Sequence, residues 1–204
     1  MALTFDNLKV HLIPRVKSCP AQIINQRLYW AAREFLSRTE VWRHVQTQSV
    51  VAAQESYTLS LPAGSSNAEI KRLSGAWYGT DSADMADSDA IDVDNYKFVV
   101  ENTMTFYTAY TSALTNGLTT EVVLIPDLFN ASEIPARYMD EWGIRGFMTL
   151  AIADLKTDKD QPWYDIEGAR KYMGDALKSM GEAKRQNIVK RKAGDLRVVP
   201  RWFA

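Results

Sequence analysis

Residues 19–62 read "CPAQIINQRLYWAAREFLSRTEVWRHVQTQSVVAAQESYTLSLP", and within this stretch the spacing of the apolar residues changes. In its first half, Ile24, Leu28, Ala31 and Phe35 follow at steps of four, three and four. That spacing places them on one face of a helix, and the proline near the start suits a first helical turn. The stretch therefore predicts a helix within residues 19–39.

After Trp42 apolar and polar residues alternate, which is typical of strands. Residues 44–62 predict a strand, a turn and a strand. The first strand begins and ends at Val45 and Val51, and the second carries three alternating apolar residues (Tyr57, Leu59 and Leu61). A Gly/Ser loop follows the second strand. Three later segments are rich in the β-branched and aromatic residues that strands favour (residues 68–80, 96–111 and 118–126). Residues 44–126 thus predict a small antiparallel β unit.

Apolar residues at helical spacing occur on both sides of this region. A short helix is predicted over residues 4–13, ended by a proline. In residues 137–157, one apolar stripe (Ile144, Met148, Ile152 and Leu155) lies beside a second (Trp142, Gly146 and Leu150). A helix over residues 162–186 is expected to begin with Pro162 in its first turn and to bury another stripe (Ile166, Ala169, Met173, Leu177 and Met180).

The order of these elements predicts an α+β fold with an inserted unit. Residues 1–43 and 136–186 are expected to form a helical bundle. Residues 44–135, which include an acidic loop over residues 81–94, form the antiparallel β insertion, and residues 187–204 form an extended C-terminal docking tail.

Composition limits the class of protein. The chain has 204 residues, 46% of them hydrophobic and 24% charged, with a formal net charge of −1. A general nucleic-acid binder is usually basic overall, so this balance argues against one. Cys19 is the one cysteine, which excludes an internal disulfide. The N-terminal residues lack the continuous apolar run of a signal peptide or membrane span, so we expect synthesis in the cytoplasm.

The small net charge hides two opposite charge blocks. Residues 81–94 hold six Asp and no cation, a charge of −6 (Asp81, Asp84, Asp87, Asp89, Asp92 and Asp94). From Lys184 onward, seven Lys and Arg face Asp195 alone, a charge of +6. Two such blocks indicate two differently charged neighbours, contact between copies of the chain, or simply solvated surface.

Catalytic motifs are absent from the sequence. His11 and His44 stand outside any nucleophile or metal motif, and no phosphate-binding glycine loop is present. Cys19 precedes a helix start, which could lower its pKa, but a small packed residue is the simpler interpretation. The acidic loop lacks the glycine and glutamate positions of an EF-hand, although a structural Ca²⁺ stays open. We expect no enzyme activity, no catalytic residue, no cofactor and no metal.

The C-terminal segment suits docking on a protein. Gly194 and Pro200 would interrupt an amphipathic membrane helix. The final residues alternate apolar and polar, which favours strand addition or anchoring in a pocket. The expected docking residues are the last eight before the terminal alanine (Leu196, Arg197, Val198, Val199, Pro200, Arg201, Trp202 and Phe203). Lys190, Arg191 and Lys192 are expected to contact DNA or an acidic partner.

The sequence resembles tailed-bacteriophage head-to-tail adaptors, also called connector or tail tubular protein A-like proteins. The resemblance lies in "CPAQIINQRLYWAAREFLSRTEVWR", "YTLSLP", "EIKRLSGAWYGT", "LAIADLKTDKDQPWYD" and "ARKYMGDALKSMGEAKRQN", in that order over nearly the whole chain. The acidic loop is not part of this pattern.

The resemblance implies a structural virion protein at the neck, assembled in the host cytoplasm. Copies of such proteins form a ring, usually of twelve, whose helical bundle makes the wall and whose β unit projects toward the tail. The ring joins the portal protein above to a tail or nozzle protein below, and DNA passes through its lumen. The C-terminal segment docks against the portal, and no membrane is involved.

Other functions stay open on the sequence alone. Another neck or tail component, such as a tail completion or baseplate protein, is the nearest alternative. A DNA-binding protein would depend on residues 190–192 and show salt-dependent affinity. A carbohydrate-binding or glycosidase module would use two surface aromatics, Trp77 and Tyr78.

Overall fold

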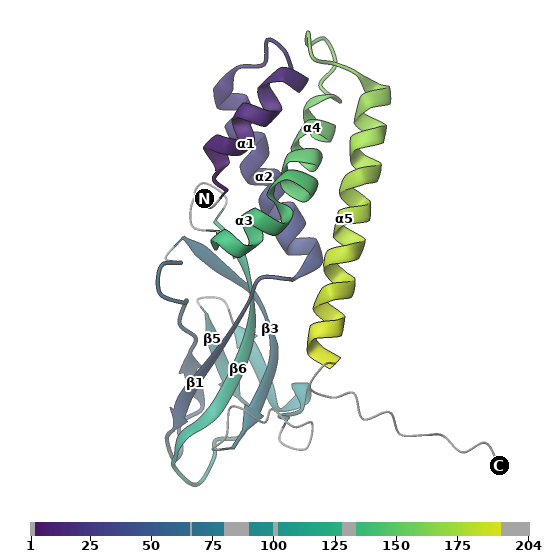
Figure 1. Cartoon of the computed structure of the whole chain (residues 1–204). Helices are drawn as coiled ribbons and strands as arrows, with labels where there is room; N and C mark the ends of the chain where they lie inside the picture. Colours follow the sequence, from purple (N-terminus) through teal and green to yellow (C-terminus); the bar gives the residue numbers. More distant parts are fainter. Residues whose placement is uncertain (1–2, 66, 80–89, 100–101, 128–133, 193–204) are drawn as a thin grey trace, which may run out of the picture. The chain divides into compact units, whose positions relative to one another are not determined.

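The computed structural model describes residues 3–65, 67–79, 90–99, 102–127 and 134–192. Helices and antiparallel sheets are both present, which confirms the predicted α+β class. The chain divides into two compact units. The helical unit takes the described residues up to Val41 and from Met139 onward, and the β unit takes Trp42–Tyr138 (Figure 1).

The helical unit combines elements from both parts of the chain, so residues far apart in sequence share one core. Its long helix α2 contacts α4, α5 and the π-helix η5. Fully buried aromatic side chains from both parts meet there, since the Phe35 ring lies 5.5 Å from that of Trp142 and 5.3 Å from that of Phe147. The elements are α1 (Phe5–Leu12), η1 (Ile13–Arg15), α2 (Ala21–Thr39), η5 (Gly143–Met148), α4 (Thr149–Leu155) and α5 (Ile166–Lys192), with α3 (Ala136–Trp142) at the boundary of the two units.

Local sequence explains where the first helices begin and end. The Thr4 hydroxyl accepts a hydrogen bond from the Asn7 backbone N–H, and the Asn7 side chain accepts from the Thr4 N–H, a capping box that starts α1. Pro20 is the N-cap of α2, and Glu40 ends the helix in a left-handed conformation with φ 54°. The helix predicted within residues 19–39 is thus confirmed.

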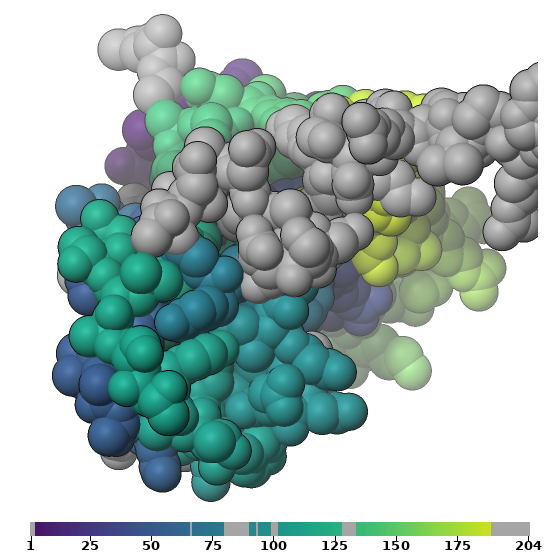
Figure 2. Space-filling view, turned by 90° about the horizontal axis from the view of Figure 1, so that it is seen from below, coloured from purple at the N-terminus to yellow at the C-terminus, as the bar shows by residue number. Residues whose placement is uncertain are grey.

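The β unit consists of two three-stranded antiparallel sheets, with strand orders β1-β6-β3 and β2-β5-β4. Residues 117–126 of the central strand β6 are buried without interruption, so both faces of this part of the strand are covered. Figure 2 shows the blue and teal residues of this unit as one closely packed mass. The elements are β1 (Arg43–Val50), β2 (Ser56–Thr58), β3 (Ala68–Tyr78), η3 (Val93–Asn95), β4 (Tyr96–Val99), β5 (Thr103–Phe106) and β6 (Leu114–Pro126).

The two strands predicted within residues 44–62 are present but belong to different sheets. β1 pairs with β6, whereas β2 pairs with β5. Val45 and Val51, expected at the ends of the first strand, are 41% and 51% exposed. Which strand pairs with which depends on the buried face that the two strands complete together. The alternation of apolar and polar residues within one strand does not determine its partner.

Two predicted helical stripes are wrong in part. η5 inserts a π-helical turn after Trp142, which shifts the phase, so Ile144 is 46% exposed while Met148 and Ile152 are buried. α5 begins at Ile166, so Pro162 precedes the helix instead of lying in its first turn. Small residues of α5 supply most of its buried face (Ala169, Ala176, Ser179 and Ala183, with Met180), whereas three of the large residues predicted there are exposed (Ile166, Met173 and Leu177).

Candidate functional site

The predicted docking tail begins as helix, which corrects its expected extended form over residues 187–192. α5 continues to Lys192, and no glycine or proline lies between Gly181 and Gly194 to interrupt it. The three predicted contact cations Lys190, Arg191 and Lys192 therefore lie on the last turns of α5. The predicted portal-docking residues all lie outside the described residues (Leu196, Arg197, Val198, Val199, Pro200, Arg201, Trp202 and Phe203).

Asn187, near the start of this segment, is a residue that no sequence motif singles out. The Asn187 side-chain amide donates hydrogen bonds to two backbone carbonyls at the end of α2, those of Thr39 at 3.4 Å and Glu40 at 3.1 Å. The last carbonyls of a helix lack partners within the helix, so this amide caps α2 from α5. The orientation of the last turns of α5 is thereby tied to the core of the helical unit.

Cations gather on the same end of α5. Lys184 and Arg185 are exposed, and together with residues 190–192 they place five cations within nine residues. Cations near a helix C-terminus interact favourably with the helix dipole, so this charge is compatible with a stable last turn. The C-terminal end of α5 therefore carries a strong positive charge.

A groove of about 400 Å³ lies between α2 and the segment that links α4 to α5. The Arg27 guanidinium lines it and bonds to the carboxylates of Asp154 at 2.7 Å and Asp158 at 3.2 Å, so its charge is already compensated. Arg27 also lies 5.5 Å from the Trp30 ring centroid, and the Trp163 indole contributes a second aromatic wall. The groove therefore combines two aromatic walls with a compensated guanidinium, and the exposed Lys159 lines it as well.

The titratable residues considered for catalysis are not assembled into a site. His11 is exposed on α1, and burial lowers the pKa of His44 on β1. Burial raises the pKa of the Cys19 thiol, and the nearby Asp158 carboxylate raises it further, which outweighs the lowering by Arg27. The lowered pKa considered for Cys19 is therefore wrong. Within the described ranges, no group of three metal-ligating side chains is found and no helix is long and apolar enough to cross a membrane.

The surface aromatics considered for sugar binding differ in their surroundings. Tyr78 stacks on Tyr110 with ring centroids 4.2 Å apart and an interplanar angle of 10°, so one face of its ring is covered. Trp77 is half-buried at the end of β3. Four of the six Asp of the acidic loop fall outside the described residues, whereas Asp92, the N-cap of η3, and Asp94, within η3, are exposed. The Asp92 carboxylate accepts a hydrogen bond from the Asp94 backbone N–H.

Three surface features stand out among the described residues: the basic end of α5, the groove beside α2, and the aromatic and acidic end of the β unit. None of these surfaces carries a nucleophile placed against a base. Comparison with known protein families and with curated protein sequences finds no match for this chain.

Proposed function

We propose that the chain is a head-to-tail adaptor of a tailed bacteriophage. In this proposal the helical unit is a bundle that forms the wall of a homo-oligomeric ring, of twelve copies as the resemblance implies. The ring docks under the portal protein, joins the capsid to a tail or nozzle protein and surrounds the DNA channel. The β unit projects toward the tail.

One observation carries the proposal: the helix that bears the docking segment is built into the core of the helical unit. α5 contacts α2, α4 and η5, and Asn187 ties its final turns to the end of α2. A segment that extends from such a base starts from a fixed point, which lowers the ordering cost when it binds. Lys184, Arg185 and residues 190–192 then lie near portal acids or DNA.

The proposed contact is made by the apolar and aromatic residues of the segment, with Trp202 and Phe203 as anchors. Truncating a buried aromatic anchor typically costs about 2 kcal/mol, or roughly a thirtyfold loss of affinity per site. Because identical segments would act together in a ring, a modest affinity per segment is sufficient for stable docking.

The test is electron microscopy of the purified chain mixed with the portal ring from the same genome. The full-length chain is compared with a chain that stops after Lys192, which keeps α5 and Asn187 intact. We expect a second ring on the portal with the full-length chain alone. A second ring with both chains would keep the adaptor role and place docking elsewhere, and no second ring with either would refute the adaptor role.

A further inference from the structure

The exposed side of α5 carries an apolar surface that the other described residues leave partly uncovered. Ile166, Met173 and Leu177 are 41%, 37% and 51% exposed, and their spacing of seven and four residues puts them on one face. Arg170 lies on that face between them, is exposed, and forms no ion pair with any described residue. These four residues are named here the α5 ridge.

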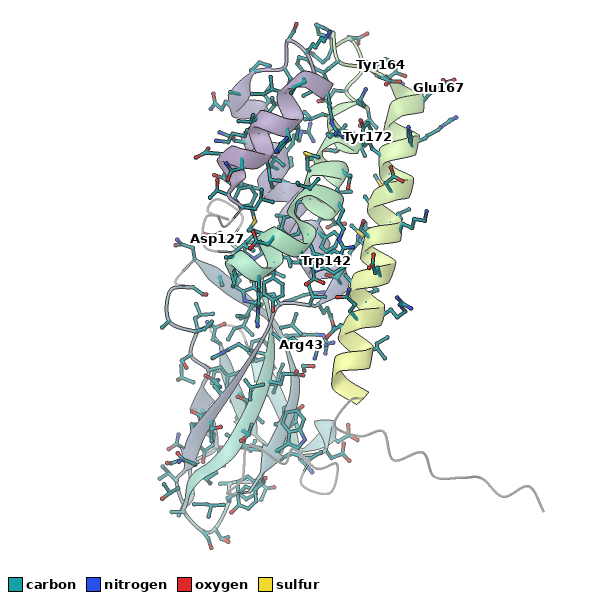
Figure 3. The ribbon with its side chains drawn as sticks, viewed as in Figure 1. Arg43, Asp127, Trp142, Tyr164, Glu167 and Tyr172 are labelled. Atoms are coloured by element: carbon teal, nitrogen blue, oxygen red, sulfur yellow. The ribbon has the colours of Figure 1, made fainter. Side chains whose placement is uncertain are left out.

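The helical unit does not need the ridge for its own core. α5 packs inward mainly through alanines, with Ala169, Ala176 and Ala183 at most 3% exposed. Figure 3 shows Tyr172 pointing toward α4 and Glu167 pointing away from it. Beside the ridge, a Cβ atom built on Gly174 would meet nothing within 4 Å, so another surface can approach α5 closely. An uncovered apolar surface of this kind commonly marks a protein interface.

One end of the β unit offers a surface of matching character. Tyr107 is 63% exposed and Val51 is 51% exposed. Backbone hydrogen bonds from Phe106 to the Glu55 carbonyl (2.9 Å) and from Tyr107 to the Asn95 carbonyl (3.0 Å) join three segments there. Five exposed residues of these segments are named here the acidic patch (Val51, Glu55, Asp92, Asp94 and Tyr107). Its three carboxylates form no ion pair with any described residue.

The two surfaces carry opposite charge. Arg170 is the charged residue of the α5 ridge, whereas the acidic patch carries the carboxylates of Glu55, Asp92 and Asp94. Surfaces of opposite charge steer molecules into register, and the exposed apolar residues of each surface then gain by burial.

We propose that copies of the chain associate head to tail, with the α5 ridge of one copy docked on the acidic patch of the next. Each copy carries both surfaces, so the contact is heterologous, and a rotation that closes generates a ring. The inference deepens the proposed function, because it names the surfaces by which copies of the adaptor meet.

Reciprocal charge reversal tests this contact in the full-length chain. The ridge variant is Arg170→Glu and the patch variant is Glu55→Lys with Asp94→Lys. Lys178→Glu is the control, because it makes the same charge change on α5 away from the ridge. Association is measured by sedimentation velocity over a range of protein concentrations at low and high salt.

We expect the wild type to associate with rising concentration, and less so at high salt. Either reversed variant alone should associate at least tenfold more weakly, while an equal mixture of the two restores association, because each surface then meets its opposite charge. The Lys178→Glu variant should behave as wild type. A wild type that stays monomeric up to its solubility limit, or a mixture that fails to restore association, would overturn the inference.

Mixing the wild type and each reversed variant with portal rings separates this inference from the proposed function. Wild-type self-association without portal stacking would remove the adaptor role and leave the ridge contact standing. If the chains stack on the portal but neither charge reversal changes their association, the adaptor role stands and the ridge contact is refuted.

Discussion

Replacing Gly146 with alanine should destabilise the helical unit, although alanine is the better helix former. A Cβ atom at this position would lie 2.6 Å from Cε2 and 3.0 Å from Cδ2 and Cζ of the Phe35 ring. That ring is fully buried between Trp142 and Phe147, so it has no free direction in which to move. Overpacking of this kind costs about 1–3 kcal/mol.

Gly174→Ala is the matched control, because its Cβ atom would meet nothing within 4 Å on an exposed face of α5. It should stabilise the protein by about 1 kcal/mol through helix propensity alone. Since both substitutions gain a similar propensity term, the difference in their free energies of unfolding isolates the clash at Phe35. Urea unfolding followed by tryptophan fluorescence should give a difference of about 1–3 kcal/mol. Equal stabilisation by the two substitutions would refute the packing described around Phe35.

Three further outcomes are expected. Asn187→Ala removes the two hydrogen bonds that cap α2 and should lower the free energy of unfolding by about 1 kcal/mol. Hydrogen exchange should then show faster amide exchange in the last turns of α5. Arg43→Ala leaves the Glu121 carboxylate, 2.6 Å from Arg43 and 11% exposed, without its guanidinium, and should lower the free energy of unfolding by about 3 kcal/mol or more in urea titrations. Because burial lowers the pKa of His44, the unfolded state takes up a proton that the folded state resists, so stability should fall as the pH drops below about 6.5. His44→Gln should remove that part of the pH dependence in denaturant midpoints measured at pH 5.5 and 7.5.

The α+β class and most elements followed from apolar spacing. α2 was predictable because one face of the helix is strongly buried, which produces the steps of four, three and four. β6 was predictable because both of its faces are buried, which produces a run of β-branched residues. Strand partners did not follow, since β1 and β2 alternate in similar ways yet join different sheets. Pairing depends on contacts between residues far apart in sequence, which a local period does not contain.

The stripe predicted for α5 failed for a different reason. Hydrophobic spacing identifies an apolar face but not whether that face is covered within one chain. In α5 the alanines allow close packing inside, and Met173 and Leu177 are left outside. Among the candidate site residues, the contact role predicted for the cations of residues 190–192 rests on their charge alone. The capping role of Asn187 was not predictable, because it depends on carbonyls about 150 residues earlier in the chain.

Insertion of the β unit also bears on the order of folding. The rings of Trp42 and Tyr138, at the two ends of that unit, lie 6.3 Å apart, and the Leu124 N–H donates to the Trp42 carbonyl. A β unit that folds first therefore brings its two flanking segments together and removes most of the loop-closure entropy from their later pairing. During synthesis α1 and α2 emerge from the ribosome long before α5, so their apolar faces stay exposed until α5 has been made. Early closure of the β unit would shorten the search once α5 appears, so a slow-folding β unit would expose the nascent helices to aggregation and to chaperones.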